Sequence, residues 1–380
     1  MNTPGLYVHV PFCEKVCDYC DFAVMPSLPS LHEEFVELLL QEAKHYRQKN
    51  TAVFESFQTL YLGGGTPSVL SPALLEKLLR GLRNLGLSFR NLQEFTMEMN
   101  PESGDEQKLL SAGAFGLSRV SLGLQTLNDD LLHTIGRKHS AKTGLDTLRL
   151  LLHYQKEKGI RVNADLMFSL PEQTIEMFLK DAETLAGSGI GHVSFYGLNI
   201  PEHSRMNTRL QQGKLSFSDE HYAEMYLKGS AVFERAGFLR YEVSNFAKPG
   251  EESIHNINYW KGGVYLGLGP SAHSYDGHTR RANPRNYAAW RRWIEAGYPE
   301  SGTEKDVLGA KEKIIEFIWL SLRQSNGLNL NDLEKMGIVI PGSVIKKWVR
   351  CGYAERNAET FRLTGEGFVF MDRVVESLLP

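Results

Sequence analysis

Cysteine is scarce in this sequence, with four residues in 380, and three of the four lie within eight positions of one another. A small secreted domain held by disulfides has an even number of cysteines spread along a short chain, so this distribution excludes that class. A single tight cluster in a long chain is typical of a metal-binding or catalytic site. The fourth cysteine, Cys351, is remote in sequence, and we predict a structural role for it because free cysteine is often buried and inert.

Long apolar runs and an excess charge of one sign are also missing. No run of about eighteen apolar residues occurs, and residues 1–5 lead into an apolar segment without a basic, cleavable leader. We therefore predict no integral membrane segment and a cytoplasmic location with reduced thiols. The net charge of −3 favours neither nucleic acid nor an anionic membrane as a partner. Hydrophobic residues make up 42% of the chain, enough for one large domain and one or two small ones.

The clustered cysteines are Cys13, Cys17 and Cys20, in a Cys-x3-Cys-x2-Cys run. Three thiolates fit zinc poorly without a histidine as fourth ligand. They fit a cubane iron-sulfur cluster, because thiolates are the ligands of such clusters and one iron is left open for a substrate or cofactor. The run therefore predicts an iron-sulfur cluster with one open iron.

Strand and helix patterns alternate along the first 200 residues. Short β-branched or aromatic runs predict strands over 6–10, 59–62, 94–99, 119–123, 161–168 and 192–198. Helical periodicity predicts a helix over 31–49, opened by a Ser30 and Glu33 capping box, and another over 141–158, between Ser140 and Gly159. Six successive strand-helix units predict a parallel α/β sheet, either a partial or complete barrel or an open doubly wound sheet.

Polar and glycine residues lie at or near the carboxyl end of each predicted strand. They are the three cysteines, the run from Gly63 to Pro67, the segment from Glu98 to Pro101, Gln125, Asp165 and Tyr196. A βα barrel builds its active site at the carboxyl ends of its strands, so we expect these residues to share one site. Strand ends are polar in any case where they meet solvent, but that explanation is weaker for six ends together.

The glycine run Gly63-Gly64-Gly65-Thr66-Pro67 allows more than one interpretation. It lacks the Gly-Lys-Ser/Thr of a phosphate loop and the spacing of a dinucleotide fingerprint. It is either a plain turn or a place where a ligand approaches the backbone, with amide and carbonyl groups open to a zwitterion.

Taken together, the cysteine run and the Gly-Gly-Gly-Thr-Pro segment resemble the radical S-adenosylmethionine superfamily. The resemblance implies a six-unit partial TIM-like (β/α)6 barrel and a 4Fe-4S cluster bound by Cys13, Cys17 and Cys20. It also implies S-adenosyl-L-methionine, whose methionine amine and carboxylate chelate the fourth iron.

Segments 7–13, 61–67, 121–126 and 165–171 are similar to the oxygen-independent coproporphyrinogen III dehydrogenase group, over almost the whole chain. The similarity implies residues around the cofactor in three sets. Tyr7 and Tyr19 border it, Gly64, Gly65 and Thr66 meet its methionine end, and Glu98, Gln125, Arg137 and Asp165 surround its adenosine and carboxylate. For Arg137 and Asp165 an ordinary salt bridge is the alternative.

Two departures separate this chain from the dehydrogenase. The dehydrogenase has a further cysteine two places after the third ligand and a long extension before the motif, whereas here Phe22 follows and only twelve residues precede Cys13. The segment His255-Asn256-Ile257-Asn258-Tyr259-Trp260 matches the H-N-x-x-Y-W signature of the HemW haem-chaperone family. The resemblance implies a haem-binding protein that passes haem to an acceptor haem protein, with an electron donor if the cluster is redox active.

The haem prediction names His255, Asn256, Tyr259 and Trp260. Histidine is a common axial ligand, and the two aromatic rings offer flat apolar surfaces to a macrocycle. The alternative is that His255 and Asn256 hydrogen-bond a loop while the aromatic residues fill the core. His273 is a second candidate ligand.

The C-terminal part changes character from about residue 311. Helices are predicted over 311–323, 330–336 and 342–350, then a hairpin over 354–363 and a final helix over 366–379. This mostly helical, winged-helix-like pattern suggests nucleic-acid binding, but eleven Lys and Arg balance eleven Asp and Glu from Glu304 to Pro380, so we predict none. The predicted domains are a barrel at 1–200, a linking segment at 201–302 and a C-terminal domain at 303–380.

Three functions remain open from the sequence. The first is a haem chaperone with an S-adenosylmethionine-bound cluster, the second is coproporphyrinogen III dehydrogenase, and the third is a radical enzyme with a non-porphyrin substrate. Phe22 and the short N-terminal segment favour the first over the second.

Overall fold

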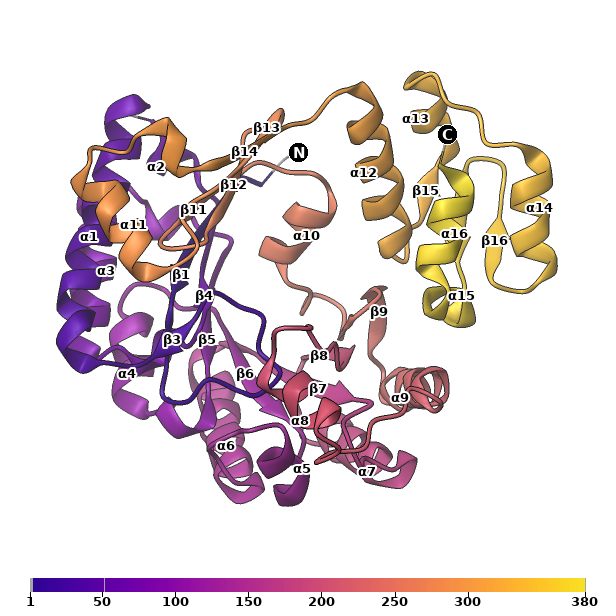
Figure 1. Cartoon of the computed structure of the whole chain (residues 1–380), viewed down its shortest axis with the longest axis horizontal. Helices are drawn as coiled ribbons and strands as arrows, with labels where there is room; N and C mark the ends of the chain where they lie inside the picture. Colours follow the sequence, from indigo (N-terminus) through magenta and orange to yellow (C-terminus); the bar gives the residue numbers. More distant parts are fainter. Residues whose placement is uncertain (1–2, 51, 380) are drawn as a thin grey trace.

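The computed structural model describes residues 3–50 and 52–379 and is built around one large sheet (Figure 1). Its six central strands are parallel and neighbour one another in chain order, which confirms the predicted strand-helix succession. These strands are β1 (Gly5–Val10), β4 (Thr59–Gly64), β5 (Glu94–Met99), β6 (Arg119–Gln125), β7 (Arg161–Phe168) and β8 (His192–Gly197). Because β1 and β8 do not pair, the barrel is partial.

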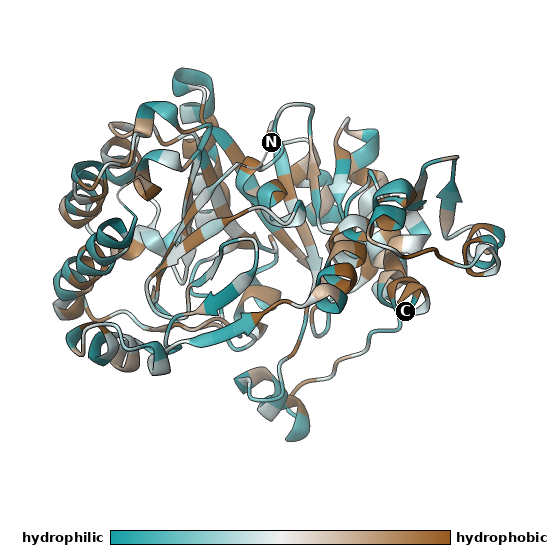
Figure 2. Cartoon of the chain, turned by 90° about the horizontal axis from the view of Figure 1, so that it is seen from above, coloured by the Kyte–Doolittle hydropathy of each residue, from teal (hydrophilic) through white to brown (hydrophobic). Residues whose placement is uncertain are grey.

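Helices cover the outer face of this sheet (Figure 1). They are α1 (Pro29–Lys49), α2 (Val53–Ser56), α3 (Pro72–Asn84), α4 (Glu106–Gly113), α5 (Asp129–Thr134), α6 (Ala141–Lys158) and α7 (Ile175–Ala186), with short 3-10 turns at Pro67–Val69, Phe89–Asn91 and Pro101–Ser103. The strands bury apolar side chains such as Leu6, Leu60 and Val162 completely. Seen from above, the outer helices turn hydrophilic residues away from the sheet (Figure 2).

The ends of two helices were predicted from capping residues in the sequence, correctly for α6 and incorrectly for α1. Ser140 caps α6 by accepting from the Thr143 amide, and Gly159 ends it with a φ of 70°, both as predicted. The predicted Ser30 and Glu33 capping box is wrong. Helix α1 begins at Pro29, because proline is suited to the first helical position and needs no amide partner there. Ser30 therefore lies within the first turn of the helix and cannot cap it.

Residues 201–302, predicted as a linking segment, extend both edges of the same sheet. Strand β11 (Tyr265–Leu268) pairs parallel with β1, and β12 (His273–Tyr275) and β13 (Thr279–Ala282) continue antiparallel beyond it. Strand β14 (Glu304–Val307), just after this segment, pairs antiparallel with β13 and ends the sheet. At the other edge β10 (Asn245–Ala247) and β9 (Leu239–Glu242) follow β8. The helices here are α8 (Arg205–Gln211), α9 (Tyr222–Arg235), α10 (Ile254–Trp260) and α11 (Tyr287–Glu295), followed by a 3-10 turn at Glu300–Gly302.

The C-terminal unit is mostly helical with a small antiparallel sheet, ordered β15-β17-β16. Its elements are α12 (Ala310–Arg323), β15 (Leu328–Asn329), α13 (Leu330–Lys335), α14 (Gly342–Arg350), β16 (Ala354–Arg356), β17 (Thr360–Leu363), α15 (Gly365–Val369) and α16 (Met371–Leu378). The single final helix predicted from the sequence is wrong. Phe370 leaves helical geometry, and its ring stacks on Tyr353 with centroids 4.7 Å apart, so two helices form.

Cys351 lies at the C-cap of α14 and is exposed, so it lacks the burial on which the prediction of a structural role was based. Among the residues described, no helix combines the length and apolarity that crossing a bilayer requires.

Candidate functional site

The cysteine loop, residues 13–24, is held in place by a strand pair at its base and by contacts with other elements along its length. Strands β2 (Phe12–Cys13) and β3 (Met25–Pro26) pair with each other and close the loop between them. Within the loop the Asp18 amide donates to the Ile135 carbonyl at 3.2 Å, and the Asp18 carboxylate pairs with Arg209 at 2.8 Å. The loop is therefore positioned by the barrel and by α8 together.

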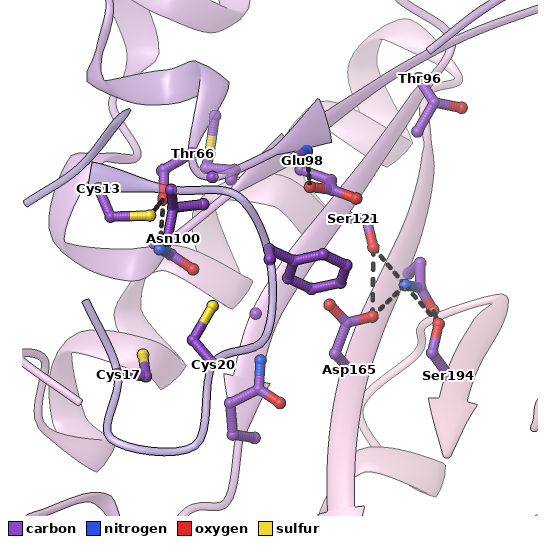
Figure 3. Close-up of a pocket in the computed structure, with 18 of the residues that line it drawn as sticks. Cys13, Cys17, Cys20, Thr66, Thr96, Glu98, Asn100, Ser121, Asp165 and Ser194 are labelled. Carbon is purple, nitrogen blue, oxygen red and sulfur yellow. Dashed lines mark hydrogen bonds between the residues drawn. The ribbon is translucent and has the colours of Figure 1, made fainter. Parts of the chain in front are cut away.

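The three thiols lie at one side of a cavity of about 320 Å³, at the carboxyl ends of the parallel strands (Figure 3). Thr66 Oγ1 donates to Cys13 Sγ at 3.5 Å, and Arg137 Nη1 donates to Cys17 Sγ at 3.4 Å. Burial raises the pKa of Cys13 to about 12 and that of Cys20 to about 11. Both sulfurs therefore carry protons at neutral pH until a metal displaces them.

The donor set suits a multi-iron cluster better than a single ion. Within residues 3–50 and 52–379, no three His, Cys, Asp or Glu side chains converge closely enough to hold one metal ion. Three separate soft thiolates at a cavity wall are the ligands that an iron-sulfur cluster requires, and their number leaves one iron without a protein thiolate.

The glycine run is a close-approach turn, because side chains would not fit there. Gly64 has a φ of 107°, which disfavours any residue with a side chain. A Cβ on Gly65 would lie 2.7 Å from the Phe12 carbonyl oxygen and 3.1 Å from Cys13 Sγ. The turn therefore leaves backbone open beside the cysteine loop, where a zwitterion could meet it.

Glu98 faces this turn from β5. Its carboxylate accepts from the Gly64 amide at 3.0 Å and from the Tyr61 hydroxyl at 2.8 Å. Burial raises the pKa of Glu98 to about 7 despite these donors, and the nearby Asp165 adds to the rise. Glu98 can thus accept hydrogen bonds from a ligand hydroxyl or amine, and it titrates near neutral pH.

Arg137 reaches the cavity between the cluster loop and β6. Its Nη2 donates to Asn100 Oδ1 at 2.7 Å and to the Gly123 carbonyl at 2.8 Å. Its Nε is buried and has no hydrogen-bond partner. A buried guanidinium with a donor to spare is suited to a carboxylate, which fits the methionine carboxylate of S-adenosylmethionine.

A polar network on the inner faces of β6, β7 and β8 was not predicted from the sequence. Asn163 Nδ2 donates to Asp165 Oδ1 at 2.7 Å and to Ser194 Oγ at 3.0 Å, and Ser121 Oγ donates to Asp165 at 3.2 Å (Figure 3). The signal was present as a period of two, since these polar residues alternate with fully buried ones such as Val162.

Most of the predicted cofactor residues share this cavity. Those that line it are Tyr19, Gly64, Gly65, Thr66, Glu98, Gln125, Arg137 and Asp165. Gln125 has a φ of 68°, and its Oε1 accepts from the Tyr196 hydroxyl at 2.9 Å. Tyr7 does not line it. The Tyr7 ring lies on a second cavity, where its hydroxyl bonds His9 Nδ1 at 3.0 Å.

The second cavity is larger, about 660 Å³, and lies on the other side of the cysteine loop and α10. Its aromatic lining comprises Tyr7, Phe22, Tyr259, Trp260, Tyr265 and Tyr275. Phe22 lines both cavities and is 71% exposed. Helix α10 also serves both, because Asn256 lines the first cavity whereas Tyr259 and Trp260 line the second.

Helix α10 is fixed through its amino end by Glu94 at the start of β5. The Glu94 carboxylate accepts from the Ile254 amide at 3.1 Å and the His255 amide at 3.0 Å, and it pairs with Arg119 at 3.0 Å. Burial alone would raise the pKa of Glu94, but Arg119, the two amides and Arg161 together hold it below its ordinary value. A carboxylate at a helix amino end is stabilising, so α10 is anchored to the barrel.

His255 is buried under this helix with both ring nitrogens engaged. Nδ1 bonds Thr59 Oγ1 at 2.7 Å, and Nε2 bonds the Tyr259 hydroxyl at 2.8 Å. Burial lowers the pKa of His255 to about 4, so the ring is neutral at pH 7. The ring is 1% exposed and does not line the second cavity, whereas the exposed His273 on β12 does.

A partial parallel barrel with three thiols and a glycine turn at its carboxyl edge defines the radical S-adenosylmethionine class. The model of the Radical SAM superfamily matches residues 7–185. The fold is similar to that of coproporphyrinogen III oxidase (HemN) from Escherichia coli, described as a radical SAM enzyme. The TM-score is 0.84 and the identity 19%, over 100% of this chain and 90% of that one.

Similar proteins of known family show to which group within the radical S-adenosylmethionine class the chain belongs. The heme chaperones HemW of Lactococcus lactis and Bacillus subtilis are each 32% identical over 98% of this chain, and the matches cover 96% and 98% of those proteins. The mitochondrial radical S-adenosyl methionine domain-containing protein 1 of Bos taurus is 33% identical over 99% of this chain and 87% of its own length. The chain belongs to the HemW family.

Proposed function

We propose that this protein is a haem chaperone that binds haem in the second cavity and transfers it to an acceptor haem protein. The observation that supports this most directly is the aromatic second cavity beside the cysteine loop, into which Tyr259 and Trp260 of the H-N-x-x-Y-W segment project. The sequence similarity to heme chaperones over nearly the whole chain supports it as well.

In this proposal the first cavity holds the cluster and S-adenosylmethionine. Cys13, Cys17 and Cys20 bind a 4Fe-4S cluster, and the Gly64 to Thr66 turn and Arg137 hold the amino acid end of the cofactor. Glu98, Gln125 and Asp165 accept hydrogen bonds from its adenosine. A reduced cluster held by these cysteines would supply one electron for reduction of the cofactor sulfonium, and an external electron donor would replace that electron.

The second cavity suits haem by size and by lining. Its volume of about 660 Å³ is twice the 320 Å³ of the first cavity, which S-adenosylmethionine and the cluster would share. Aromatic rings bind a flat macrocycle through offset stacking and area burial. The predicted haem residues then divide into two groups. Tyr259 and Trp260 contact haem, while His255 and Asn256 position the helix that carries them.

The test is anaerobic reconstitution with iron and sulfide, followed by haem titration with and without S-adenosylmethionine. We expect a saturable shift of the haem Soret band at about one haem per chain. Trp260→Leu removes one stacking surface and should weaken haem binding by about tenfold, equivalent to ~1.4 kcal/mol. Trp319→Leu is the matched control, because Trp319 is partly buried in α12 and lies outside the second cavity.

A titration of the wild-type protein without a saturable shift would refute the proposal. Equal weakening by both tryptophan variants would refute the assignment of haem to this cavity. The rival dehydrogenase activity is tested in the same preparation by adding reductant and coproporphyrinogen III. We expect no protoporphyrinogen, since the resemblance to that enzyme rests on fold at 19% identity and Phe22 stands where it has a further cysteine.

A further inference from the structure

The second cavity contains a histidine whose imidazole is free. We infer that His273 is the axial iron ligand of haem bound there, and that Arg280 and Arg285 bind its propionates. The inference rests on the proposed function and deepens it, because it names the atoms that would hold the cargo.

Two histidines line the second cavity, His9 and His273. His9 Nδ1 bonds the Tyr7 hydroxyl and Nε2 bonds the Ala23 carbonyl at 3.0 Å, so neither nitrogen is available. His255, under the cavity wall, has both nitrogens bonded to Thr59 and Tyr259. In the part of the chain that the structure describes, the His273 side chain has no hydrogen-bond partner and therefore has a nitrogen to offer iron.

The backbone of β12 and β13 directs His273 into the cavity. In this hairpin His273 pairs with Ala282, and Tyr275 pairs with Arg280. All four residues line the second cavity, as expected for alternate positions on one face of a hairpin. His273 thus stands on a strand of the main sheet and not on a loose loop, which suits a residue that must hold an iron in a defined geometry.

The strand is also packed too closely to shift. A Cβ on Gly267 of β11 would lie 2.1 Å from the His273 carbonyl oxygen, so only glycine allows β12 to approach β11 this closely. Ser274 Oγ accepts from the Gly267 amide at 3.0 Å across the same contact. These contacts set the position of the His273 backbone before any ligand arrives.

The two arginines give the cavity groups that recognise carboxylates. Arg280 packs over Tyr275 at 5.3 Å, pairs with Glu316 and hydrogen-bonds Tyr265, which together use only part of the five N–H donors of its guanidinium. Arg285 is largely exposed, and its Nη2 donates to the Asp21 carbonyl at 3.3 Å. Asp21 and Glu304 also line the cavity. The pair between Arg285 and Asp21 is exposed and therefore weak, so a propionate can displace the Asp21 carboxylate from Arg285.

The experiment uses the full-length reconstituted protein with ferric haem, followed by absorption and resonance Raman spectra. His273→Ala should abolish the histidine-ligated spectrum and weaken haem binding at least tenfold, and added imidazole should restore the spectrum. His278→Ala is the matched control, because His278 is exposed near the turn of the same hairpin and bonds Lys313 Nζ at 3.0 Å. It should leave the haem spectrum unchanged.

A second variant guards against misfolding as an explanation. His273→Met should replace the histidine signature with that of a thioether ligand if His273 binds iron. An unchanged wild-type spectrum in both His273 variants would overturn the ligand assignment while leaving the haem-chaperone proposal intact. Absence of a saturable Soret shift in the wild-type protein would instead overturn the proposal on which the inference rests.

The propionate contacts are tested with haem dimethyl ester, which keeps the macrocycle and removes the carboxylates. Arg280→Ala and Arg285→Ala should each weaken binding of haem several-fold and leave binding of the ester unchanged. Equal weakening of haem and ester by either variant would overturn the carboxylate role of that arginine.

Discussion

At the residue scale, hydrogen-bond saturation distinguishes three histidines that look alike in sequence. His9 and His255 are buried, burial lowers the pKa of each to about 4, and each uses both ring nitrogens within the protein. A neutral histidine with two bonded nitrogens is a positioning group. His255 therefore holds Tyr259 at the cavity wall, whereas the ring of His273 is exposed and lines the second cavity.

The cysteine assignments are tested by serine replacements. Cys13→Ser, Cys17→Ser and Cys20→Ser should each abolish the absorption near 400 nm of the reconstituted cluster and lower bound iron well below four per chain. Cys351→Ser is the control, since Cys351 is exposed at the end of α14 and far along the chain from the loop. Iron loss in Cys351→Ser, or iron retention in the other three variants, would contradict the assignment.

Residue roles at the strand ends could be predicted because parallel strands bring their carboxyl ends together. That rule selected Glu98, Gln125 and Asp165, which do line one cavity. It could not select Asn163 or Ser121, because both lie further from the carboxyl ends of their strands, and only the inward direction of their side chains brings them to the cavity. Tyr7 was assigned by resemblance, and its side chain lies toward the second cavity.

At the scale of elements, a buried carboxylate ties helix α1 to the outer strands. Glu42 is fully buried and accepts from the Gly269 amide at 2.9 Å, Asn283 Nδ2 at 2.7 Å and Trp290 Nε1 at 3.0 Å. Gly269 follows β11, and Trp290 lies in α11. One carboxyl group thus joins the first long helix to elements more than 220 residues later in the chain.

Glu42 makes stability depend on pH. Burial raises the pKa of Glu42 from 4.5 to about 7, so its protonated form is favoured by folding. That stabilising contribution is complete below about pH 4.5 and is lost as pH rises to 7, a change of roughly 3 kcal/mol. Urea unfolding of Glu42→Gln should lack this decline, whereas Glu37→Gln, an exposed change on α1, should follow the wild-type curve. Parallel curves for wild type and Glu42→Gln would contradict the prediction.

Helices and strands whose hydrophobic residues repeat with a clear period could be predicted from the sequence, and those without such a period could not. The strands over 94–99 and 161–168 and the helix over 141–158 have the predicted bounds. The strands β9 to β13 are three or four residues long, too short to show a period, and they form only because the edges of the main sheet offer them partners.

At the scale of the whole molecule, one arginine joins the C-terminal unit to the sheet and to helix α10. Arg323, near the end of α12, pairs with the fully buried Glu242 at 2.6 Å and packs over Trp260 at 4.2 Å. The Gln324 side chain donates to the Trp260 carbonyl at 2.9 Å. The C-terminal unit therefore contacts Trp260, a residue in the wall of the second cavity.

Arg323→Met should destabilise the protein by about 3–5 kcal/mol, because it leaves the Glu242 carboxylate buried without its ion partner. Arg362→Met removes an exposed pair with Glu355 and should cost no more than about 1 kcal/mol. The measurement is urea unfolding of both variants beside the wild type. Combining Arg323→Met with Glu242→Gln should recover part of the loss, and similar losses for the two single variants would contradict this account.

The cysteine loop is a shared wall, since Phe22 faces both cavities only two residues after Cys20. If two ligands that contact this common wall are thermodynamically coupled, the coupling acts equally in both directions. If assembling the cluster tightens haem binding by some factor, bound haem must tighten retention of the cluster by the same factor. The rate at which the haem-loaded protein loses iron, compared with that of the haem-free protein, would then measure how strongly the cluster affects haem binding.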